Sequence, residues 1–444
     1  MKILITTDTY EPAVNGVVSS IKTLSQELLR LGHDVRILAP STKNEVRGNV
    51  YYIKALSVQS IYPDARLAYP KLLPLGLMAD LIEWKPDIIH AQTEFSTYLT
   101  ARKIARSCKA PIVNTVHTYY EDYTQYFAPS DELGRLALKR FMHLVLRDSA
   151  AIIVPSMKIA SVLERYGLSR PVFCIPTGIP LEKFKPQLAE GGDKELKELK
   201  KSLGIPEENF VFISLGRVGK EKNPGMLLKA FSRAIQAGLK QASLLYVGDG
   251  PALEGLKQEA QRLSLAKTEV LFAGRVSPDK VAAYYQLADM FVCASNSETQ
   301  GLTYLEALSS GTPLLVKHDL CLQGVLREGT NGYGFSSEQE CAELMCKLRS
   351  EPELIRHLSL GAELSAQEHS ASSFGKTIED LYHRVLERAS SHEKELFGGR
   401  LIGLEHSAKD KAEEISILRD QVLTIVTERL NLKAGPESES KDND

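Results

Sequence analysis

The sequence predicts an α/β protein built from two doubly wound, Rossmann-like domains that face one cleft. Short runs rich in β-branched and aromatic residues alternate with amphipathic helical stretches, which is typical of right-handed βαβ units and parallel sheets. This alternation occurs in two series, separated by a charged stretch. The length of 444 residues also exceeds what one hydrophobic core usually supports. We therefore expect two domains joined by a linker and followed by a C-terminal helical extension.

The first domain is expected over residues 1–186 and the linker over residues 187–205. Helical stretches are clearest at 17–31 and near 133–148. The linker contains "QLAEGGDKELKELKKS", a charged run that interrupts the apolar pattern and indicates a helix. The strands of this domain are expected in "KILITT", "DVRILAP", "PDIIHA", "PIVNTV", "AAIIVPS" and "VFCIP".

The second domain is expected over residues 206–372, and a closing helix follows at 373–389. Helices near 339–349 and 352–368 end the domain. Its strands are expected in "FVFISLGR", "SLLYVGDG", "EVLFAG", "DMFVCAS" and "TPLLVKHD".

The segment 390–444 departs from this alternation. Residues 411–432, "KAEEISILRDQVLTIVTERLNL", have an apolar stripe at helical spacing, and the polar residues after them have the composition of disorder. The stripe suits either self-association with a second chain or packing back on the same domain. The sequence does not distinguish between these two arrangements.

The composition excludes several classes of protein. The chain is 43% hydrophobic and 25% charged, and its net charge of −2 gives no global reason to expect nucleic acid as a partner. Its six cysteines form no CxxC pair, so reduced thiols are expected. The start "MKILITTDTY" lacks the features of a signal peptide, and no run is long enough to span a bilayer. We expect a cytoplasmic protein, either soluble or peripheral on the inner face of the cell membrane.

The loop after the first strand is a candidate phosphate site. In "TYEPAVNGVVSSIKTL", Asn15 and Gly16 lead into a predicted helix. The first backbone N–H groups of such a helix form an anion site, and glycine leaves them accessible. The alternative is a glycine that serves only the turn.

A second loop offers cations for the same ligand. In "SLGRVGKEKNP", a predicted strand ends and Arg217, Lys220 and Lys222 follow. Cations at the carboxyl end of a strand suit a phosphate-bearing ligand. The alternative is a solvated, charged loop.

The string "SNSETQGLTYLEALSSGTP" contains two glutamates with seven residues between them. Glu298 precedes a predicted helix and Glu306 lies in its second turn, so the two side chains are expected to contact different parts of a ligand. The first amides of that helix, at Gly301, Leu302 and Thr303, are unsatisfied donors that favour an anion.

A dense polar and aromatic cluster, "NTVHTYYEDY", follows a predicted buried strand. Strands of open α/β sheets end at the crevice where ligands bind, so His117 and Tyr120 are candidate site residues. The alternative is that His117 only caps the strand end through hydrogen bonds.

Together these motifs resemble the retaining glycosyltransferases of family 4, which have the two-domain GT-B fold. The resemblance covers residues 1–388 and rests on "NGV", the "HT" after a strand, "GRVGKEKNP", "VGDGP", "FAGRV" and the paired glutamates in "ETQGLTYLEALSSGTP". Through "TDTYEPAVNGVVSSI" and "HTYYEDY" the chain is most similar to bacterial glucosyltransferases that act on 1,2-diacylglycerol. The resemblance implies a hexosyltransferase with a nucleotide-sugar donor, UDP-glucose in that subfamily, and a lipid acceptor.

The resemblance also implies a catalytic set. Arg217 and Lys222 correspond to the clamp on the donor's diphosphate. Glu298 corresponds to the residue that holds the hydroxyl groups of the donor sugar, and His117 to the contact on the O6 side of that sugar.

The remaining donor contacts follow from the same resemblance. The loop of Asn15 and Gly16 faces the diphosphate clamp, and Glu306 corresponds to the ligand of the nucleotide's ribose. Arg275 and Val276 correspond to the segment that lines the nucleobase. The helix start at Gly301, Leu302 and Thr303 completes the expected donor site.

The sequence gives no reason to expect a metal or a cofactor. A retaining transfer by double displacement needs a carboxylate nucleophile opposite a separate acid, and neither half shows such a pair. The family is thought instead to use front-face attack, in which the leaving diphosphate helps to take the acceptor's proton. The one D-x-D string is "DND" at 442–444, in the polar terminus. We expect no obligatory divalent cation.

Residues 135–147, "RLALKRFMHLVLR", contain no acidic residue and predict a basic amphipathic helix. Such a helix can lie in an anionic lipid interface, and with the segment 62–78 it favours a lipid acceptor. The alternative is a helix that packs one face on its own core. Its apolar residues Leu138, Phe141 and Val145 are expected on the surface. The expected acceptor or membrane residues are Tyr120, Arg140 and the stripe of every fourth residue formed by Arg135, Lys139, His143 and Arg147.

Two other functions use the same motifs. The fold also hosts enzymes that glycosylate soluble sugars or polysaccharides, whose donor motifs are alike. A noncatalytic binding protein is disfavoured because Arg217, Lys222, Glu298 and Glu306 are all present.

Overall fold

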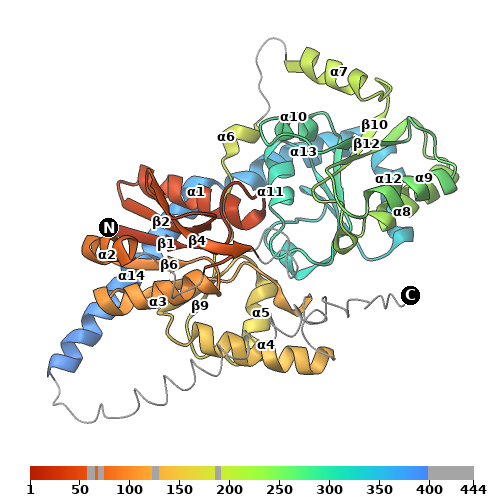
Figure 1. Ribbon diagram of the computed structural model, residues 1–444. Helices are drawn as coiled ribbons and strands as arrows, with labels where there is room; N and C mark the ends of the chain where they lie inside the picture. The colour runs from red at the N-terminus through yellow and green to blue at the C-terminus, as the bar shows by residue number, and fades with distance from the viewer. Residues whose placement is uncertain (58–65, 69–74, 123–129, 186–191, 399–444) are drawn as a thin grey trace, which may run out of the picture. The chain divides into compact units, whose positions relative to one another are not determined.

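The structure is a computed structural model with two β-sheets, each flanked by helices (Figure 1). Both sheets lie in one compact unit, which comprises residues 1–119 and 139–387, while residues 120–138 and 388–444 make up another. The predicted α/β class is confirmed. The structure describes residues 1–57, 66–68, 75–122, 130–185 and 192–398.

The first sheet has nine strands in the order β3-β4-β2-β1-β6-β7-β8-β9, with β5 paired to β4. Adjacent strands in this sheet are parallel, except in the antiparallel pairs β3–β4 and β4–β5. The chain moves outward from β1 to β2 and β4, then returns to β6 on the other side of β1. The strands are β1 (Lys2–Thr6), β2 (Asp34–Ser41), β3 (Glu45–Arg47), β4 (Val50–Ser57), β5 (Arg66–Ala68), β6 (Ile88–Ala91), β7 (Ile112–Thr115), β8 (Ala151–Val154) and β9 (Val172–Cys174).

The second sheet has six parallel strands in the order β12-β11-β10-β13-β14-β15. The chain moves from β10 to β11 and β12, then returns to β13 on the other side of β10. The order of strands therefore reverses between β10 and β13, as it does between β1 and β6. The strands are β10 (Phe210–Leu215), β11 (Ala242–Val247), β12 (Val270–Gly274), β13 (Met290–Cys293), β14 (Leu314–Lys317) and β15 (Gly332–Phe335).

Helices connect the strands in both series. Those of the first series are α1 (Gly16–Arg30), α2 (Leu75–Trp84), α3 (Ser96–Cys108), α4 (Asp131–Leu146), α5 (Met157–Tyr166) and α6 (Leu181–Phe184). Those of the second series are α7 (Gly192–Ser202), the short 3-10 turn η3 (Lys220–Lys222), α8 (Pro224–Gln236), α9 (Leu253–Arg262), α10 (Val281–Gln286), α11 (Leu302–Ser309), the 3-10 turn η4 (Leu320–Leu322), α12 (Glu338–Ser350), α13 (Pro352–Gln367) and α14 (Ala371–Gly398).

Both faces of the second sheet are buried. Alternate strand residues such as Phe212 and Leu244 pack with α8, α9 and α12, whereas their neighbours Ile213 and Leu245 pack with α10, α11 and α13. Because both faces face protein, these strands read as continuous apolar runs, which is why the sequence predicted them. The helix expected in the linker is α7, and its Leu199 packs against the second of these cores.

The last helix, α14, returns to the first sheet. Phe374, Ile378 and Tyr382 of α14 share a core with Ile3 of β1 and Ile21 of α1. The helix continues to Gly398, past the predicted end at residue 389. The core of the first domain is therefore completed by a helix that follows the second domain in the chain.

Several strands were not predicted. The edge strands β3 and β5 have three residues each, and β4 carries tyrosines and a lysine among its apolar residues. The strand β15 has the sequence GYGF, in which the glycines weaken the strand signal. The missing strands are short, polar or rich in glycine, so they lack the apolar run that marks a buried strand.

A buried histidine links α14 to the first sheet. His90 of β6 is 1% exposed, and its Nδ1 lies 2.6 Å from the hydroxyl of Tyr382. Its Nε2 lies 2.6 Å from Oγ1 of Thr115 in β7. Burial, and to a smaller extent the nearby His117, lowers the pKa of His90 to about 3.

Acid should destabilise this protein through His90. In the unfolded chain His90 is protonated at about pH 6.5, but in the folded chain only at about pH 3. Between these values the unfolded chain binds more protons than the folded chain. The free energy of unfolding therefore falls as the pH is lowered through this range. The measurement is the free energy of unfolding in urea at about pH 7 and at about pH 5. Between these two conditions it should fall by roughly 2 kcal/mol less in His90→Gln than in the wild type. His383→Gln, at an exposed position of α14, is the matched control. Equal pH dependence in wild type and His90→Gln would contradict this account.

Candidate active site

The predicted site residues lie beyond the carboxyl ends of strands, and several follow the strands at which the strand order reverses. Arg217 and Lys222 follow β10, and Glu298 follows β13, which is paired with β10. In the first sheet, Asn15 lies on the loop after β1, and His117 follows β7. Loops at such reversals lead to helices on opposite faces of a sheet, so the strand ends between them are open to a ligand.

Asn15 caps the first helix. Its Oδ1 accepts a hydrogen bond from the backbone N–H of Val18 at 3.0 Å, and its Nδ2 donates to Oγ1 of Thr9 at 3.2 Å. The side chain is therefore engaged within its own loop. An anion at this helix start would bind through the backbone N–H groups of Gly16 and Val17.

The start of α1 meets the start of α11. A β carbon on Gly16 would lie 3.7 Å from Cδ1 of Leu302, the first residue of α11. Gly301 caps α11 with a left-handed φ of 76°, and a β carbon there would lie 2.3 Å from the ring of Tyr304, so only glycine fits. Helix N-termini carry partial positive charge, and the first residue of α1 here lies near the first side chain of α11. The predicted donor amides of Leu302 and Thr303 lie in the first turn of α11.

Lys222 forms an ion pair with Glu298. The lysine side chain is 33% exposed and the glutamate side chain 12% exposed. Burial by itself would lower the pKa of Lys222, but the carboxylate of Glu298 outweighs it and raises the pKa above its usual range. The structure therefore brings the predicted phosphate cation and the predicted sugar carboxylate into direct contact.

The loop of Arg217 packs against the loop after β11. Gly248 has a φ of 137°, and a β carbon on it would lie 1.8 Å from the carbonyl oxygen of Gly216. The "VGDGP" motif thus allows the two loops to touch. Arg217 itself is exposed, and its guanidinium lies 3.7 Å from the carboxylate of Glu221.

Glu306 is held by a residue that the sequence did not reveal. Tyr285 of α10, which is fully buried, donates a hydrogen bond from its hydroxyl to Oε2 of Glu306 at 2.9 Å. Burial raises the pKa of Glu306. Arg275 and Val276 follow β12, where Arg275 is exposed and Val276 packs against the core that contains Tyr285. No spacing pattern connects Tyr285 with the glutamate motif, so only the fold identifies it.

His117 is fixed by a second residue that was not predicted. Its Nε2 lies 2.7 Å from Oε1 of Gln92, which is 1% exposed. Since that amide oxygen only accepts, Nε2 of His117 must donate. Burial lowers the pKa of His117 to about 4, so the ring is neutral near pH 7 and its Nδ1 is an acceptor. His117 is therefore suited to receive a hydrogen bond from a hydroxyl group.

The predicted basic helix needs two corrections. Helix α4 ends at Leu146, so Arg147 lies outside the stripe, and its Nε lies 3.7 Å from a carboxylate oxygen of Asp148. Leu138 and Val145 are buried rather than on the surface. The reason is that the apolar side of α4 serves a core, so its residues and the cations cannot all share the exposed side.

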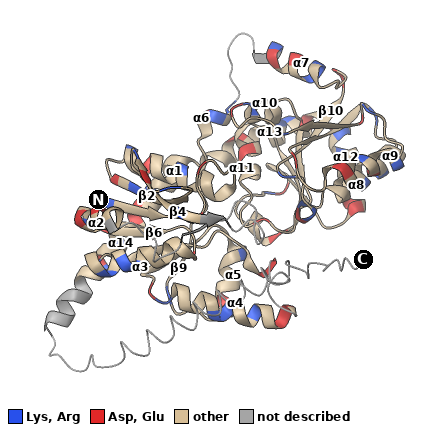
Figure 2. Cartoon of the chain, viewed as in Figure 1, with Lys and Arg blue, Asp and Glu red and all other residues tan. Residues whose placement is uncertain are grey.

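Three of the predicted cations are exposed on α4. Arg135, Lys139 and Arg140 lie on its surface, and Figure 2 shows basic positions along this helix and acidic ones at its start. His143 is engaged elsewhere, because its Nε2 lies 2.7 Å from the carbonyl oxygen of Tyr166. The structure adds two exposed leucines that were not predicted, Leu133 and Leu136, which are 56% and 47% exposed.

Some predictions are not decided by these contacts. Tyr120 begins a short 3-10 turn in the unit that comprises residues 120–138 and 388–444, so its place at an acceptor site stays a prediction. The segment 62–78 lies mostly outside the described residues, and the helix at 411–432 lies wholly outside them. Among the described residues, no three His, Cys, Asp or Glu side chains are arranged to hold a metal. None of the helices within the described ranges is long and apolar enough to cross a membrane.

Comparisons with known proteins identify the class. The model of "Glycosyltransferase Family 4" matches residues 14–183, and that of "Glycosyl transferases group 1" matches residues 196–363. Among solved structures, Anabaena Alr3699/HepE, solved with UDP and glucose, has a TM-score of 0.67 at 17% identity over 86% of this chain and 100% of its own. Sucrose-phosphate synthase from Thermosynechococcus elongatus has a TM-score of 0.66 at 19% identity over 87% of this chain and 99% of its own. These similarities confirm the GT-B fold.

Two curated relatives are more similar in sequence. An alpha-monoglucosyldiacylglycerol synthase from Streptococcus pneumoniae is 37% identical over 391 residues, which are 86% of this chain and 85% of the relative. One from Acholeplasma laidlawii is 29% identical over 398 residues, which are 87% of this chain and 98% of the relative. The chain therefore belongs to the GT-B glycosyltransferases of family 4, as the motifs predicted, and it is a glycosyltransferase close to the diacylglycerol glucosyltransferases.

The two glutamates should have separable kinetic effects. Glu306→Gln should raise the donor KM and largely spare kcat, because the ribose contact expected of Glu306 would be remote from the bond that breaks. Glu298→Gln should lower kcat, because the expected contact of Glu298 with the transferred sugar would orient the anomeric carbon. Steady-state kinetics at saturating acceptor, with calorimetric binding of the free nucleoside diphosphate, distinguish these effects. The isosteric Tyr285→Phe should act like a weaker Glu306→Gln. A reversed pattern would mean that the donor lies along α11 in the opposite direction.

Proposed function

We propose that this enzyme transfers glucose from UDP-glucose to a lipid acceptor such as 1,2-diacylglycerol, with retention of configuration. The observation that carries the proposal is the contact of Lys222 with Glu298, which lies on the loop that leads into α11. The names of the two curated relatives, both alpha-monoglucosyldiacylglycerol synthases, support the sugar and the acceptor.

The contact between Lys222 and Glu298 suits a sugar joined to a phosphate. A cation that binds the diphosphate and a carboxylate that binds sugar hydroxyls must lie close together, because one bond joins the two parts of the donor. The starts of α1 and α11 are proposed to add backbone donors for the same diphosphate. Glu306, a further turn along α11, is then available to the nucleoside.

Retention is consistent with the chemistry of the relatives' product. UDP-glucose carries an α-linked sugar, so an enzyme that makes an α-glucoside from it retains the configuration. We propose a front-face transfer, in which the acceptor hydroxyl attacks on the side from which the diphosphate leaves. The leaving oxygen takes the acceptor's proton, and Lys222 and Arg217 stabilise the growing negative charge.

His117 is proposed to bind the donor sugar as an acceptor of a hydrogen bond. Its Nε2 is engaged by Gln92, and its neutral ring offers Nδ1. A hydroxyl on the O6 side of a hexose is a suitable donor for this nitrogen. Gln92 is proposed to fix the ring in this tautomer.

The exposed side of α4 is proposed to contact an anionic membrane. Leu133 and Leu136 are apolar groups that can enter the interface, and Arg135, Lys139 and Arg140 can bind acidic head groups. A diacylglycerol acceptor resides in the bilayer, so such a contact would bring the enzyme to its substrate. We infer a cytoplasmic enzyme that is peripheral on the inner face of the membrane.

Loss of the diphosphate cation should reduce transfer strongly. Lys222→Ala should lower kcat/KM about a hundredfold, or roughly 3 kcal/mol of transition-state stabilisation. The assay is glucose transfer from UDP-glucose to diacylglycerol in mixed micelles, with free hexoses as competing acceptors. Lys229→Ala, at an exposed position of α8, is the matched control and should be unaffected. If the enzyme transferred glucose to soluble sugars in preference to diacylglycerol, the acceptor would be a soluble sugar and not a lipid. If Lys222→Ala turned over normally, Lys222 would not bind the diphosphate.

Removal of the cations of α4 should weaken membrane binding. Each surface cation contributes on the order of 1 kcal/mol near an anionic bilayer, so Arg135, Lys139 and Arg140 changed together to glutamine should lower affinity for anionic liposomes roughly a hundredfold. Leu133→Ser with Leu136→Ser should also reduce cosedimentation. The control changes Lys229, Lys240 and Arg262, three exposed cations of the second sheet's helices and loops, to glutamine. Unchanged cosedimentation of the α4 variants would exclude this helix as the membrane contact.

A further inference from the structure

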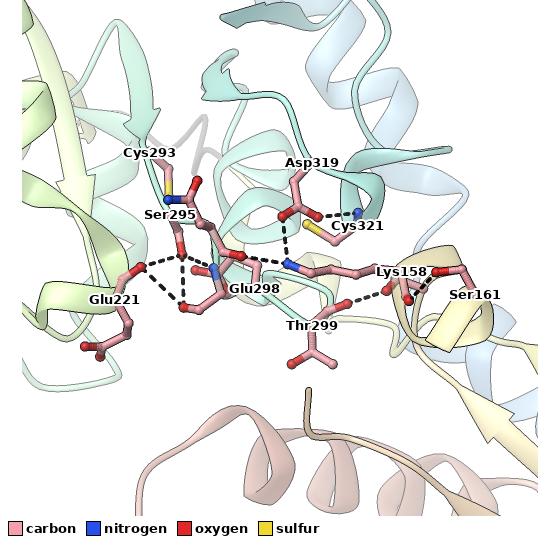
Figure 3. Close-up of polar contacts among 12 residues, drawn as sticks. Lys158, Ser161, Glu221, Cys293, Ser295, Glu298, Thr299, Asp319 and Cys321 are labelled. Carbon is pink, nitrogen blue, oxygen red and sulfur yellow. Dashed lines mark hydrogen bonds and ion pairs between the residues drawn. The ribbon is translucent and has the colours of Figure 1, made fainter. Parts of the chain in front are cut away.

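The loop that carries Glu298 is fastened on the side of the diphosphate loop. Residues 294–300 lead from β13 to Gly301, the N-cap of α11. The hydroxyls of Ser295 and Ser297 donate to the carbonyl oxygen of Glu221 at 3.5 and 3.4 Å, and Glu221 precedes Lys222 (Figure 3). These bonds hold one end of the loop against the turn that carries Lys222. Other residues must hold the rest of the loop.

Residues of the first series hold this remaining part of the loop. Lys158, near the start of α5, donates from its Nζ to the carbonyl oxygen of Asn296 at 2.8 Å. The hydroxyl of Ser156, directly before α5, donates to the carbonyl oxygen of Thr299. The two bonds flank Glu298 on both sides along the chain.

A third attachment follows immediately. The side chain of Gln300 accepts from the backbone N–H of Thr177 at 3.0 Å and donates to the carbonyl oxygen of Thr177 at 2.8 Å. The hydroxyl of Thr177 lies 2.8 Å from that of Ser20 in α1. The Gln300 side chain thus pairs with both backbone polar groups of Thr177, directly before the helix start at Gly301.

Lys158 is the charged member of these attachments. Its Nζ also donates to Oδ2 of Asp319 at 2.7 Å, and the two side chains are 11% and 13% exposed. The other carboxylate oxygen, Oδ1 of Asp319, accepts from the backbone N–H of Cys321 at 2.9 Å. A buried ion pair is weak evidence for stability, because apolar residues of similar volume often serve as well. What an apolar residue cannot supply here is the hydrogen bond to Asn296.

We propose that Lys158 is a positioning residue for the transfer step, which fixes the loop of residues 294–300 so that Glu298 meets the donor sugar. Lys158 acts through the carbonyl of Asn296, and Asp319 orients its ammonium group. The proposal rests on the proposed role of Glu298 in binding that sugar. It gives the first series of elements a direct effect on the geometry of a residue that belongs to the second.

The first test is a split between turnover and nucleotide binding. Lys158→Met, combined with Asp319→Asn so that no carboxylate is left buried without a partner, should lower kcat between about tenfold and a hundredfold. The Kd of UDP should change less than about twofold, because its proposed contacts are elsewhere. Ser161→Ala is the matched control, since it removes a 2.9 Å bond to the Lys158 carbonyl in α5 without touching the loop. Equal losses in kcat and UDP affinity would overturn the proposal.

The second test is the dependence of Lys158 on Glu298. If Lys158 acts through Glu298, then adding Lys158→Met to Glu298→Gln should change single-turnover rates less than about twofold, whereas independent effects would multiply and overturn the proposal. Ser156→Ala removes a neutral attachment of the same loop, and it should lower kcat without changing the Kd of UDP. Full activity in both Ser156→Ala and Lys158→Met would overturn the proposal. This outcome can be reached even if one of the other variants does not fold. Wild-type activity in Glu298→Gln would instead refute the proposed function of Glu298.

Discussion

The reversal of strand order in each sheet is the constraint on which the site depends. In the second sheet the chain leaves β10 in one direction and returns beside it at β13, so the loops after these two strands start next to each other. One loop brings Lys222 and the other brings Glu298, and the two side chains meet. Without the reversal, the cation and the carboxylate would follow strands that are not neighbours.

The fold was predictable wherever both faces of a strand are buried. Such strands appear as apolar runs, and the runs that became β6, β7, β8, β10 and β11 are of this kind. The edge strands β3 and β5 are short, the inner strand β4 is partly polar, and none of the three was predicted. The length of α14 was underestimated, because an amphipathic pattern shows where a helix packs but not where it stops when no glycine or proline ends it.

The site was predictable only where its residues are close in sequence. Glu298 and Glu306 belong to one motif, and Lys222 lies in another, so a resemblance of motifs was enough to name them as candidates. Tyr285 touches Glu306 and Gln92 touches His117 from other elements, and no local pattern marks such contacts. The same limit explains the error at α4, where the spacing of cations predicted a stripe but did not show that Leu138 and Val145 face a core.

The two lysines beside Glu298 differ in a way that separates chemistry from positioning. Lys222 is partly exposed and bound chiefly to one carboxylate, so a diphosphate can reach it and compete with Glu298 for it. Lys158 is buried between Asp319 and the carbonyl of Asn296, and removal of either partner would leave a charge that water reaches poorly. A lysine that can exchange partners is suited to a leaving group whose charge changes during the reaction. A lysine that cannot exchange them is suited to holding one geometry throughout it.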